Sequence, residues 1–370
     1  MSQQPHPSQS VLTVDLGAIV ANYRLLRSRL KGAECAAVVK ADAYGLGALR
    51  VAPALAAAGA RDFFVAHLGE ALEIRGALPT EARIYVLNGM LHGEADELRA
   101  RNLVPVLNDL GQIDAWSLEA RRSGAKLPAI VQFDTGMSRL GLTDDEADRL
   151  IAEPRYLQHI ELGFVMSHLA CADEPSHPLN AGQLEAFAAR RRAFAGVPAS
   201  LANSSGIFLG ARYHFDLARP GCALYGINPV PGRPNPVGQV ARLSGKILQI
   251  RDVDPPRTVG YGATHRVAAR TRVATIAAGY ADGWLRSLSN RGSAYFGDVR
   301  VPIIGRVSMD LITLDVTATP QIRVGDSVEL MGDRLTVDDV ATKAGTIGYE
   351  VLTRLGRRFA RVYVDLPAST

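Results

Sequence analysis

Short hydrophobic runs recur along the first 226 residues and alternate with segments of helical character, such as 182–196 (GQLEAFAARRRAFAG). Runs rich in Val, Ile, Leu and Phe are typical of buried parallel strands. They begin at residues 36 (AAVVKADA), 62 (DFFVAH), 83 (RIYVLNG), 103 (LVPVLND), 129 (AIVQFDTG), 162 (LGFVMSHLA), 200 (SLANSSG) and 215 (FDLARPGCALYG). Strands that alternate with helices predict an α/β fold, and eight such units predict a closed (β/α)8 TIM-type barrel.

The pattern changes after residue 236. The segment 233–240 (RPNPVGQV) has the composition of a linker, and later runs such as 271–280 (TRVATIAAGY) predict strands separated by Gly, Pro and Asp turns. A helical pattern returns only near 338–345. We therefore expect two domains, a barrel over 1–236 and a mainly β domain over 237–370. The first dozen residues could pack on either.

Composition and charge narrow the class of protein. The 370 residues carry a formal net charge of +4 that is spread along the chain, without the clustered basic face of a nucleic-acid-binding protein. No apolar run is long enough to span a membrane. Cys35, Cys171 and Cys222 lack C-x-x-C spacing, which argues against a disulfide framework and a zinc knuckle. We expect a cytoplasmic protein, because the first residues, MSQQPHPSQS, lack the apolar core of a signal peptide.

Polar side chains stand at or near the C-terminal ends of the predicted barrel strands, where the active sites of such barrels lie. These residues are Lys40, His67, Asn88, Asn108, Asp134, His168, Asn203 and Arg219. A metal site made of His67, Asp134 and His168 is conceivable. We expect no metal, however, because Lys40 and Arg219 would repel a divalent cation. A cationic rim suits an anionic ligand instead.

Small residues follow the last two predicted barrel strands, which is where this architecture commonly binds phosphate. Asn203 and Ser204 follow the seventh strand, and Gly221 and Cys222 follow the eighth. Small side chains let backbone N–H groups approach phosphate oxygens, although the same residues also form ordinary turns. Lys40 taken alone could be a strand-end lysine in solvent. Together, a lysine and a phosphate pocket suggest pyridoxal phosphate, whose aldehyde condenses with a lysine amine.

A set of short motifs gives the chain a resemblance to a known family. The motifs are VVKADAYGLG (38–47), DTGMSRLG (134–141), MSHLACADE (166–174), ARPGCALYG (218–226), VGYGATH (259–265), GYADGW (279–284), GRVSMD (305–310) and YEVLTR (349–354). In this order they resemble those of the alanine racemases, which are pyridoxal-phosphate enzymes of fold type III, from about residue 11 to 364. The resemblance implies a racemase that uses pyridoxal 5'-phosphate to interconvert L- and D-alanine for peptidoglycan precursors.

The resemblance also implies roles for individual residues. Lys40 would hold the cofactor and act as one catalytic base, and Tyr261 would be the second base on the opposite face. Arg219 would face the pyridine nitrogen, and His168 and Arg219 would lower the pKa of Tyr261. The implied cofactor-binding positions are Lys40, Tyr44, Arg139, His168, Asn203, Ser204, Arg219, Gly221, Cys222 and Tyr349. The implied substrate-binding positions are Arg139, Tyr280, Met309 and Asp310.

Two further expectations follow from the resemblance. In the family, the positions of Tyr261, Met309 and Asp310 belong to the partner subunit, so we expect a homodimer with shared active sites. Many relatives carry a carbamylated lysine where this chain has Gln132. A neutral amide can orient Arg139 only by a hydrogen bond roughly half as strong as a charge-assisted one.

Other functions stay open from the sequence alone. A serine or broad-specificity racemase of the same family is an alternative, because one hydroxyl can change binding little. A basic amino-acid decarboxylase of the same fold type would favour a glutamate at the pyridine nitrogen, and Arg219 argues against it. A non-catalytic pyridoxal-phosphate carrier would need only the barrel, and the segment 237–370 argues against that function.

Overall fold

A seven-stranded parallel sheet lies at the centre of the N-terminal domain in the computed structural model, which describes residues 8–365. Its strands neighbour one another in chain order, as successive βα units do: β3 (Ala37–Val38), β4 (Asp62–Val65), β5 (Arg83–Val86), β6 (Leu103–Leu107), β7 (Leu127–Gln132), β8 (Ile160–Met166) and β9 (Ala199–Ser200). β10 (Leu217–Ala218) pairs in parallel with β2 (Glu34–Cys35), and Asn203 bridges to Arg219 beside β9. The sheet therefore closes into a barrel, and the predicted fold class is confirmed.

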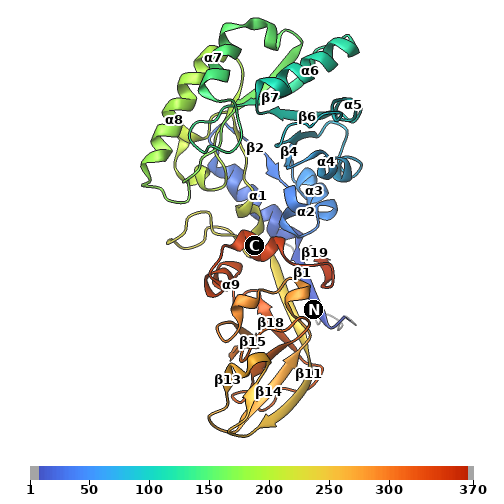
Figure 1. Ribbon diagram of the computed structural model, residues 1–370, viewed down its shortest axis with the longest axis vertical. Coiled ribbons are helices and arrows are strands. Elements are labelled where there is room, and N and C mark those ends of the chain that lie inside the picture. Colours follow the sequence, from blue (N-terminus) through green and yellow to red (C-terminus); the bar gives the residue numbers. More distant parts are fainter. Residues whose placement is uncertain (1–7, 366–370) are drawn as a thin grey trace.

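Helices surround this barrel (Figure 1). They are α1 (Leu16–Arg29), α2 (Lys40–Tyr44), α3 (Ala48–Ala57), α4 (Leu68–Arg75), α5 (Ala95–Ala100), α6 (Leu110–Ser123), α7 (Asp144–Ala152) and α8 (Pro178–Arg191). The helix expected over 182–196 is α8, which begins earlier because Pro178 suits a first helical position and His177 caps it. Across the described part of the chain, the structure contains no helix with the length and hydropathy needed to cross a membrane.

A second, mainly β domain follows the barrel, as predicted (Figure 1). Its strands are β11 (Ala241–Val253), β12 (Thr258–Val259), β13 (His265–Arg266), β14 (Thr271–Ile276), β15 (Ser293–Phe296), β16 (Val299–Pro302), β17 (Ile312–Asp315), β18 (Ser327–Met331) and β19 (Ala360–Val364). The helix expected near residue 338 is α9 (Val337–Ala344), and α10 (Gly348–Thr353) follows it and contacts α2 of the barrel. The long strand β11 pairs with β14 and β18 and forms the centre of the domain.

The N-terminal strand β1 (Ser10–Asp15) belongs to this second sheet, whereas the sequence fitted either domain. It pairs antiparallel with β11 and parallel with β19, from Val11 opposite Ala360 to Asp15 opposite Val364. Asp15 then caps α1 by accepting a hydrogen bond from the Ala18 N–H at 2.9 Å. From Ser10 onward the chain thus passes from the β sheet through the barrel and returns to the same sheet. The division of the chain at residue 236 stays a prediction.

Candidate active site

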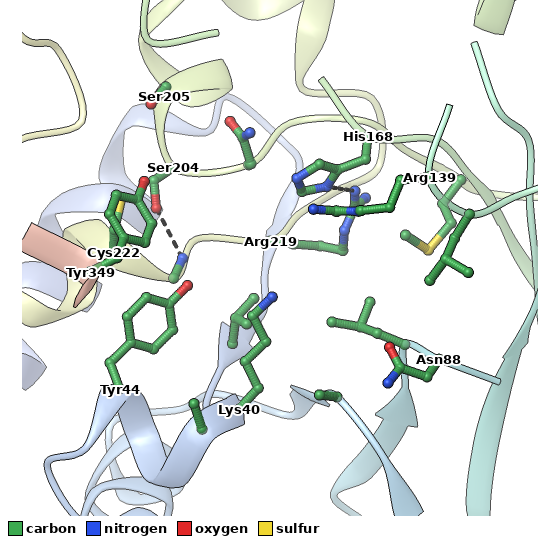
Figure 2. Close-up of a pocket in the computed structure, with 18 of the residues that line it drawn as sticks. Lys40, Tyr44, Asn88, Arg139, His168, Ser204, Ser205, Arg219, Cys222 and Tyr349 are labelled. Atoms are coloured by element: carbon green, nitrogen blue, oxygen red, sulfur yellow. Dashed lines mark hydrogen bonds between the residues drawn. The ribbon is translucent and has the colours of Figure 1, made fainter. Parts of the chain in front are cut away.

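A cavity of about 530 Å³ opens at the C-terminal ends of the barrel strands. Every position that the sequence predicted to bind the cofactor lines this cavity: Lys40, Tyr44, Arg139, His168, Asn203, Ser204, Arg219, Gly221, Cys222 and Tyr349 (Figure 2). These residues come from α2, from the loops after β7 to β10, and from α10 of the second domain. Residues that are far apart in sequence therefore meet in one pocket.

The turn that carries Lys40 has an unusual backbone. Lys40 follows β3 by two residues, and Ala41, Asp42, Ala43 and Tyr44 have φ angles of 54°, 54°, 53° and 57°, in the left-handed helical region. Gly45 ends the turn with φ 83°, and a Cβ there would lie 2.5 Å from the Leu352 carbonyl oxygen. In this conformation the Lys40 amine and the Tyr44 hydroxyl both point into the cavity (Figure 2).

The Lys40 amine lies in an environment that favours its uncharged form. Burial lowers its pKa from the usual value, and the positive charge of Arg139 lowers it further, while Glu70 acts in the opposite direction. An uncharged amine is needed both for attack on a carbonyl and for acceptance of a proton. Lys40 is therefore suited to nucleophilic and acid–base chemistry.

Arg219 is buried at the base of the cavity with only 3% of its surface exposed. Its guanidinium donates to the Ser167 carbonyl oxygen at 2.6 Å, to the Ser200 hydroxyl, and to His168 Nδ1 at 3.3 Å. Burial lowers the pKa of Arg219 to about 9, so the guanidinium stays protonated at neutral pH. Burial, Arg219, Arg139 and Lys40 together lower the pKa of His168 to about 3. His168 is thus a neutral acceptor that orients Arg219, so it does not supply the positive charge that was expected of it beside Tyr261.

Hydroxyl groups line the opposite end of the cavity, around Ser204 and Gly221. Ser204 Oγ accepts hydrogen bonds from the Gly221 N–H at 2.9 Å and the Ala223 N–H at 3.3 Å (Figure 2). A Cβ at Gly221 would lie 2.3 Å from Tyr44 Oη, so glycine lets this hydroxyl reach the cavity. Burial raises the pKa of both Tyr44 and Tyr349, which keeps their hydroxyl protons in place as donors. Protonated hydroxyls beside a small-residue loop are suited to a phosphate group.

The predicted second base and most predicted substrate-binding residues lie elsewhere. Tyr261, Met309, Tyr280 and Asp310 are in the second domain and do not line the cavity. The exposed fractions are 72% for Tyr261, 53% for Met309 and 39% for Tyr280. Asp310 forms an exposed ion pair with Arg358 at 2.8 Å. A single chain therefore does not bring these four residues to its own Lys40.

Three polar residues at strand ends serve the fold rather than the cavity. Asn108 is buried and donates to the Leu87 and Val106 carbonyl oxygens at 3.0 and 2.8 Å. Asp134 Oδ1 accepts from three successive backbone N–H groups of the loop after β7, at residues 136 to 138. His67 is exposed and occupies the position before α4, but its side chain forms no capping hydrogen bond to that helix.

Gln132 lines the cavity, but its amide does not orient Arg139 as expected. Its Nε2 donates instead to the Leu140 carbonyl oxygen at 3.0 Å. Because Leu140 is the next residue after Arg139, Gln132 fixes the backbone of this loop. The Arg139 guanidinium is exposed at the rim and has no hydrogen bond to Gln132 within the part of the chain that the structure describes.

Three residues that position the predicted ones were not predicted from the sequence. Ser167 and Ser200 hold Arg219, and the fully buried Gln183 of α8 donates from Nε2 to the His168 carbonyl oxygen at 2.8 Å. Ser200 could have been predicted from the sequence, because it lies in a run typical of a buried barrel strand, where a hydroxyl needs a polar partner. Gln183 lies on a helix far along the sequence, and no local pattern marks it.

The cavity thus combines a lysine of lowered pKa with a small-residue loop lined by hydroxyl groups, at the C-terminal ends of parallel barrel strands. These features are typical of a class of barrel that binds a phosphorylated carbonyl compound. Models of the N-terminal and C-terminal domains of alanine racemase match residues 14–229 and 240–363, and the chain belongs to the alanine racemase family.

Individual relatives agree with this assignment. An alanine racemase of Rhodospirillum rubrum is 54% identical over 357 residues, which cover 96% of each chain. A catabolic alanine racemase of Mesorhizobium japonicum is 50% identical over 357 residues, covering 96% of this chain and 93% of the relative. The crystal structure of alanine racemase from Bartonella henselae with covalently bound pyridoxal phosphate is 42% identical and superposes with a TM-score of 0.94, over 97% of this chain and 100% of that one.

Proposed function

We propose that this protein is a pyridoxal-phosphate-dependent alanine racemase that interconverts L- and D-alanine and so supplies or recycles D-alanine for peptidoglycan. The observation that supports this proposal most strongly is the cavity of about 530 Å³ in a chain of this family. Lys40, Arg219 and the small-residue loop around Ser204 and Gly221 all line it. Relatives that share about half of the residues over nearly the whole chain are alanine racemases. The cytoplasmic location stays a prediction.

The residues of the cavity fit pyridoxal phosphate. Its phosphate would lie at the Ser204 and Gly221 cradle, within reach of the Tyr44 and Tyr349 hydroxyls, and its aldehyde carbon would be held by the Lys40 amine. Arg219 would face the ring nitrogen, because it is the buried cation at the base of the cavity. When bound, the cofactor supplies an electron-withdrawing ring that acidifies the α-proton of an amino acid attached to it.

Arg219 would act inside the barrel as a hydrogen-bond donor, and Lys40 would act as an acid and base. The Arg219 guanidinium stays protonated and is fixed by Ser167, Ser200 and His168, so it donates a hydrogen bond without giving up a proton. A ring nitrogen that accepts a hydrogen bond from Arg219 instead of a proton would be a weaker electron sink, which would disfavour side reactions such as transamination. The Lys40 amine, freed when the amino group of the substrate takes its place on the cofactor, would remove or return the α-proton on one face, and its lowered pKa suits this role.

Racemisation needs a second base on the opposite face, and Tyr261 is our candidate. Its side chain is 72% exposed on the second domain and does not line the cavity of its own barrel. We therefore expect a second copy of the chain to supply Tyr261, with Met309, Tyr280 and Asp310 nearby, in a homodimer with shared sites. Arg139 at the rim would bind the substrate carboxylate.

The proposed activity is tested by incubating L-alanine, and separately L-serine, with the purified protein and measuring each D-enantiomer. We expect D-alanine to form at a rate that far exceeds that of D-serine, and Lys40→Ala to abolish the reaction. Comparable rates with both substrates would favour a broad-specificity racemase. No conversion of either, in protein that holds pyridoxal phosphate at Lys40, would favour the carrier function.

The shared site is tested by mixing two inactive variants. A heterodimer of Lys40→Ala and Tyr261→Phe subunits contains one site with both substitutions and one site with neither. We expect activity to return on mixing, relative to each variant alone. If heterodimers form, as shown by tagged purification, and remain inactive, Tyr261 does not act across the subunit interface.

A further inference from the structure

The left-handed turn after Lys40 must be held by its surroundings. Four consecutive residues that are not glycine occupy the left-handed helical region, from Ala41 to Tyr44. This conformation costs about 1–2 kcal/mol for each such residue, and it persists only where neighbouring groups over-determine it. The groups that contact this turn are therefore candidates for positioning the Lys40 side chain.

Several hydrogen bonds hold the turn, and one of them reaches the residue next to Lys40. At the far end, Asp42 Oδ1 accepts from the Ala48 N–H at 2.6 Å, and Arg361 Nη2 donates to the Gly45 carbonyl oxygen at 3.0 Å. At the near end, Glu70 Oε1 accepts from the Ala41 N–H at 2.7 Å. Ala41 directly follows Lys40, so Glu70 fixes the peptide that Lys40 shares with its neighbour.

Both oxygens of the Glu70 carboxylate are used. Oε2 accepts from the Ala66 N–H at 2.7 Å, just after β4, so the carboxylate joins the ends of two neighbouring barrel strands. Only 17% of the Glu70 side chain is exposed. Short, charge-assisted bonds to two backbone donors are stronger than neutral ones, and a fixed carboxylate also places a negative charge beside the cavity.

The charged groups around Lys40 come from several elements. Arg139, in the loop after β7, opposes the positive charge on the Lys40 amine, and Glu70, on α4, favours it. His168, after β8, is neutral at physiological pH because its pKa is lowered to about 3. The negative charge of Glu70 therefore raises the pKa of the Lys40 amine, whereas the positive charge of Arg139 lowers it.

We propose that Glu70 is a positioning residue for Lys40, acting through the Ala41 N–H and through its negative charge, without touching the cofactor or the substrate. The carboxylate orders the strained turn, and its charge limits how far Arg139 and burial shift the amine toward its uncharged form. The kinetic part of the test below rests on the function proposed above, whereas the labelling part uses cofactor-free protein and does not.

The test compares Glu70→Gln and Glu70→Asp with the control Glu73→Gln, which removes the same charge from an exposed position on the same helix. In Glu70→Gln, an amide NH₂ faces one of the two backbone donors and the charge is lost. In Glu70→Asp, the charge remains but the side chain is one methylene shorter. Circular dichroism and thermal unfolding establish which variants fold.

The first readout is the pKa of Lys40 in the cofactor-free protein, measured by trace acetylation across pH and peptide mass spectrometry. We expect a lower pKa for Lys40 in Glu70→Gln than in the wild type or in Glu73→Gln, and a nearly unchanged pKa in Glu70→Asp. A purely structural clamp would not separate the two Glu70 variants in this way.

The second readout is the kinetics of alanine racemisation. We expect kcat to fall by about 10- to 100-fold in both Glu70 variants, because small misplacements of a reacting group have effects of this size. KM should change far less, since Arg139 is untouched. Wild-type kcat and an unshifted Lys40 pKa in Glu70→Gln would overturn the proposal. If Glu70→Gln does not fold, a wild-type kcat in Glu70→Asp would overturn it equally.

Discussion

Replacing Gly221 by alanine should weaken cofactor binding by a predictable amount. A Cβ at this position would lie 2.3 Å from Tyr44 Oη and 3.1 Å from the ring carbon that bears it. Because non-bonded contacts settle near 3.5 Å, Tyr44 would have to retreat by about 1 Å. Its ring is buried and stacks on Tyr225 with the ring centroids 4.6 Å apart, so the retreat displaces a packed aromatic pair.

Overpacking of this kind costs about 1–3 kcal/mol. If that cost falls on the bound state, the affinity for pyridoxal phosphate drops by about 5- to 150-fold. Titration of the cofactor-free protein, followed by the absorbance of the bound cofactor, measures the dissociation constant directly. Gly182→Ala is the matched control, since a Cβ there on α8 meets nothing within 4 Å. An unchanged dissociation constant for Gly221→Ala would refute this account of the cradle.

Three further predictions concern stability and the support of Arg219. Between pH 6.5 and about 3 the unfolded state binds a proton at His168 that the folded state does not, so the free energy of unfolding should fall as pH drops below 6.5, by up to about 1.4 kcal/mol per pH unit. His168→Gln should flatten this part of the profile in urea titrations, and an unaltered slope would contradict the assignment. Asp62→Asn weakens the pair of bonds to Arg83 Nε and Nη2 at 2.7 and 2.8 Å and should cost about 1–3 kcal/mol in urea unfolding; a change near zero would show that the pair is dispensable. Ser200→Ala leaves a buried Arg219 N–H without its hydroxyl acceptor and should lower kcat by about tenfold, and wild-type turnover would argue against a role for Ser200 in holding Arg219.

The barrel was predictable because its strands are buried on both faces and therefore read as continuous apolar runs. Each predicted run overlaps an observed strand, even where only two residues pair, as in β3 and β9. Lys40, Asn203 and Arg219 were also recoverable, since the C-terminal ends of parallel strands converge on one rim. Tyr44 and Tyr349 could be predicted to line the cavity only from the family resemblance, because a tyrosine in a sequence does not by itself indicate a phosphate-binding role.

Other features have no local signal in the sequence. The left-handed turn contains alanine, aspartate and tyrosine, and only Gly45 at its end hints at unusual backbone. Gln132 was expected to contact Arg139, but the carbonyl of Leu140 is the acceptor that the loop places beside it. Glu70 and Gln183 form hydrogen bonds with backbone groups of other elements, such as the Ala41 N–H and the His168 carbonyl oxygen. Their roles depend on three-dimensional proximity, which hydrophobic periodicity does not encode.

The pairing of β1 with β11 and β19 has a consequence for biosynthesis. Among the strands in residues 8–365, β1 leaves the ribosome first and its partner β19, which begins at Ala360, leaves last. The β sheet therefore cannot close until residues 360–364 have emerged, whereas the barrel strands β3 to β10 emerge earlier. We expect nascent chains arrested before β19 to contain a protease-resistant barrel and an unpaired N-terminal strand, with sheet closure as a slow, long-range final step.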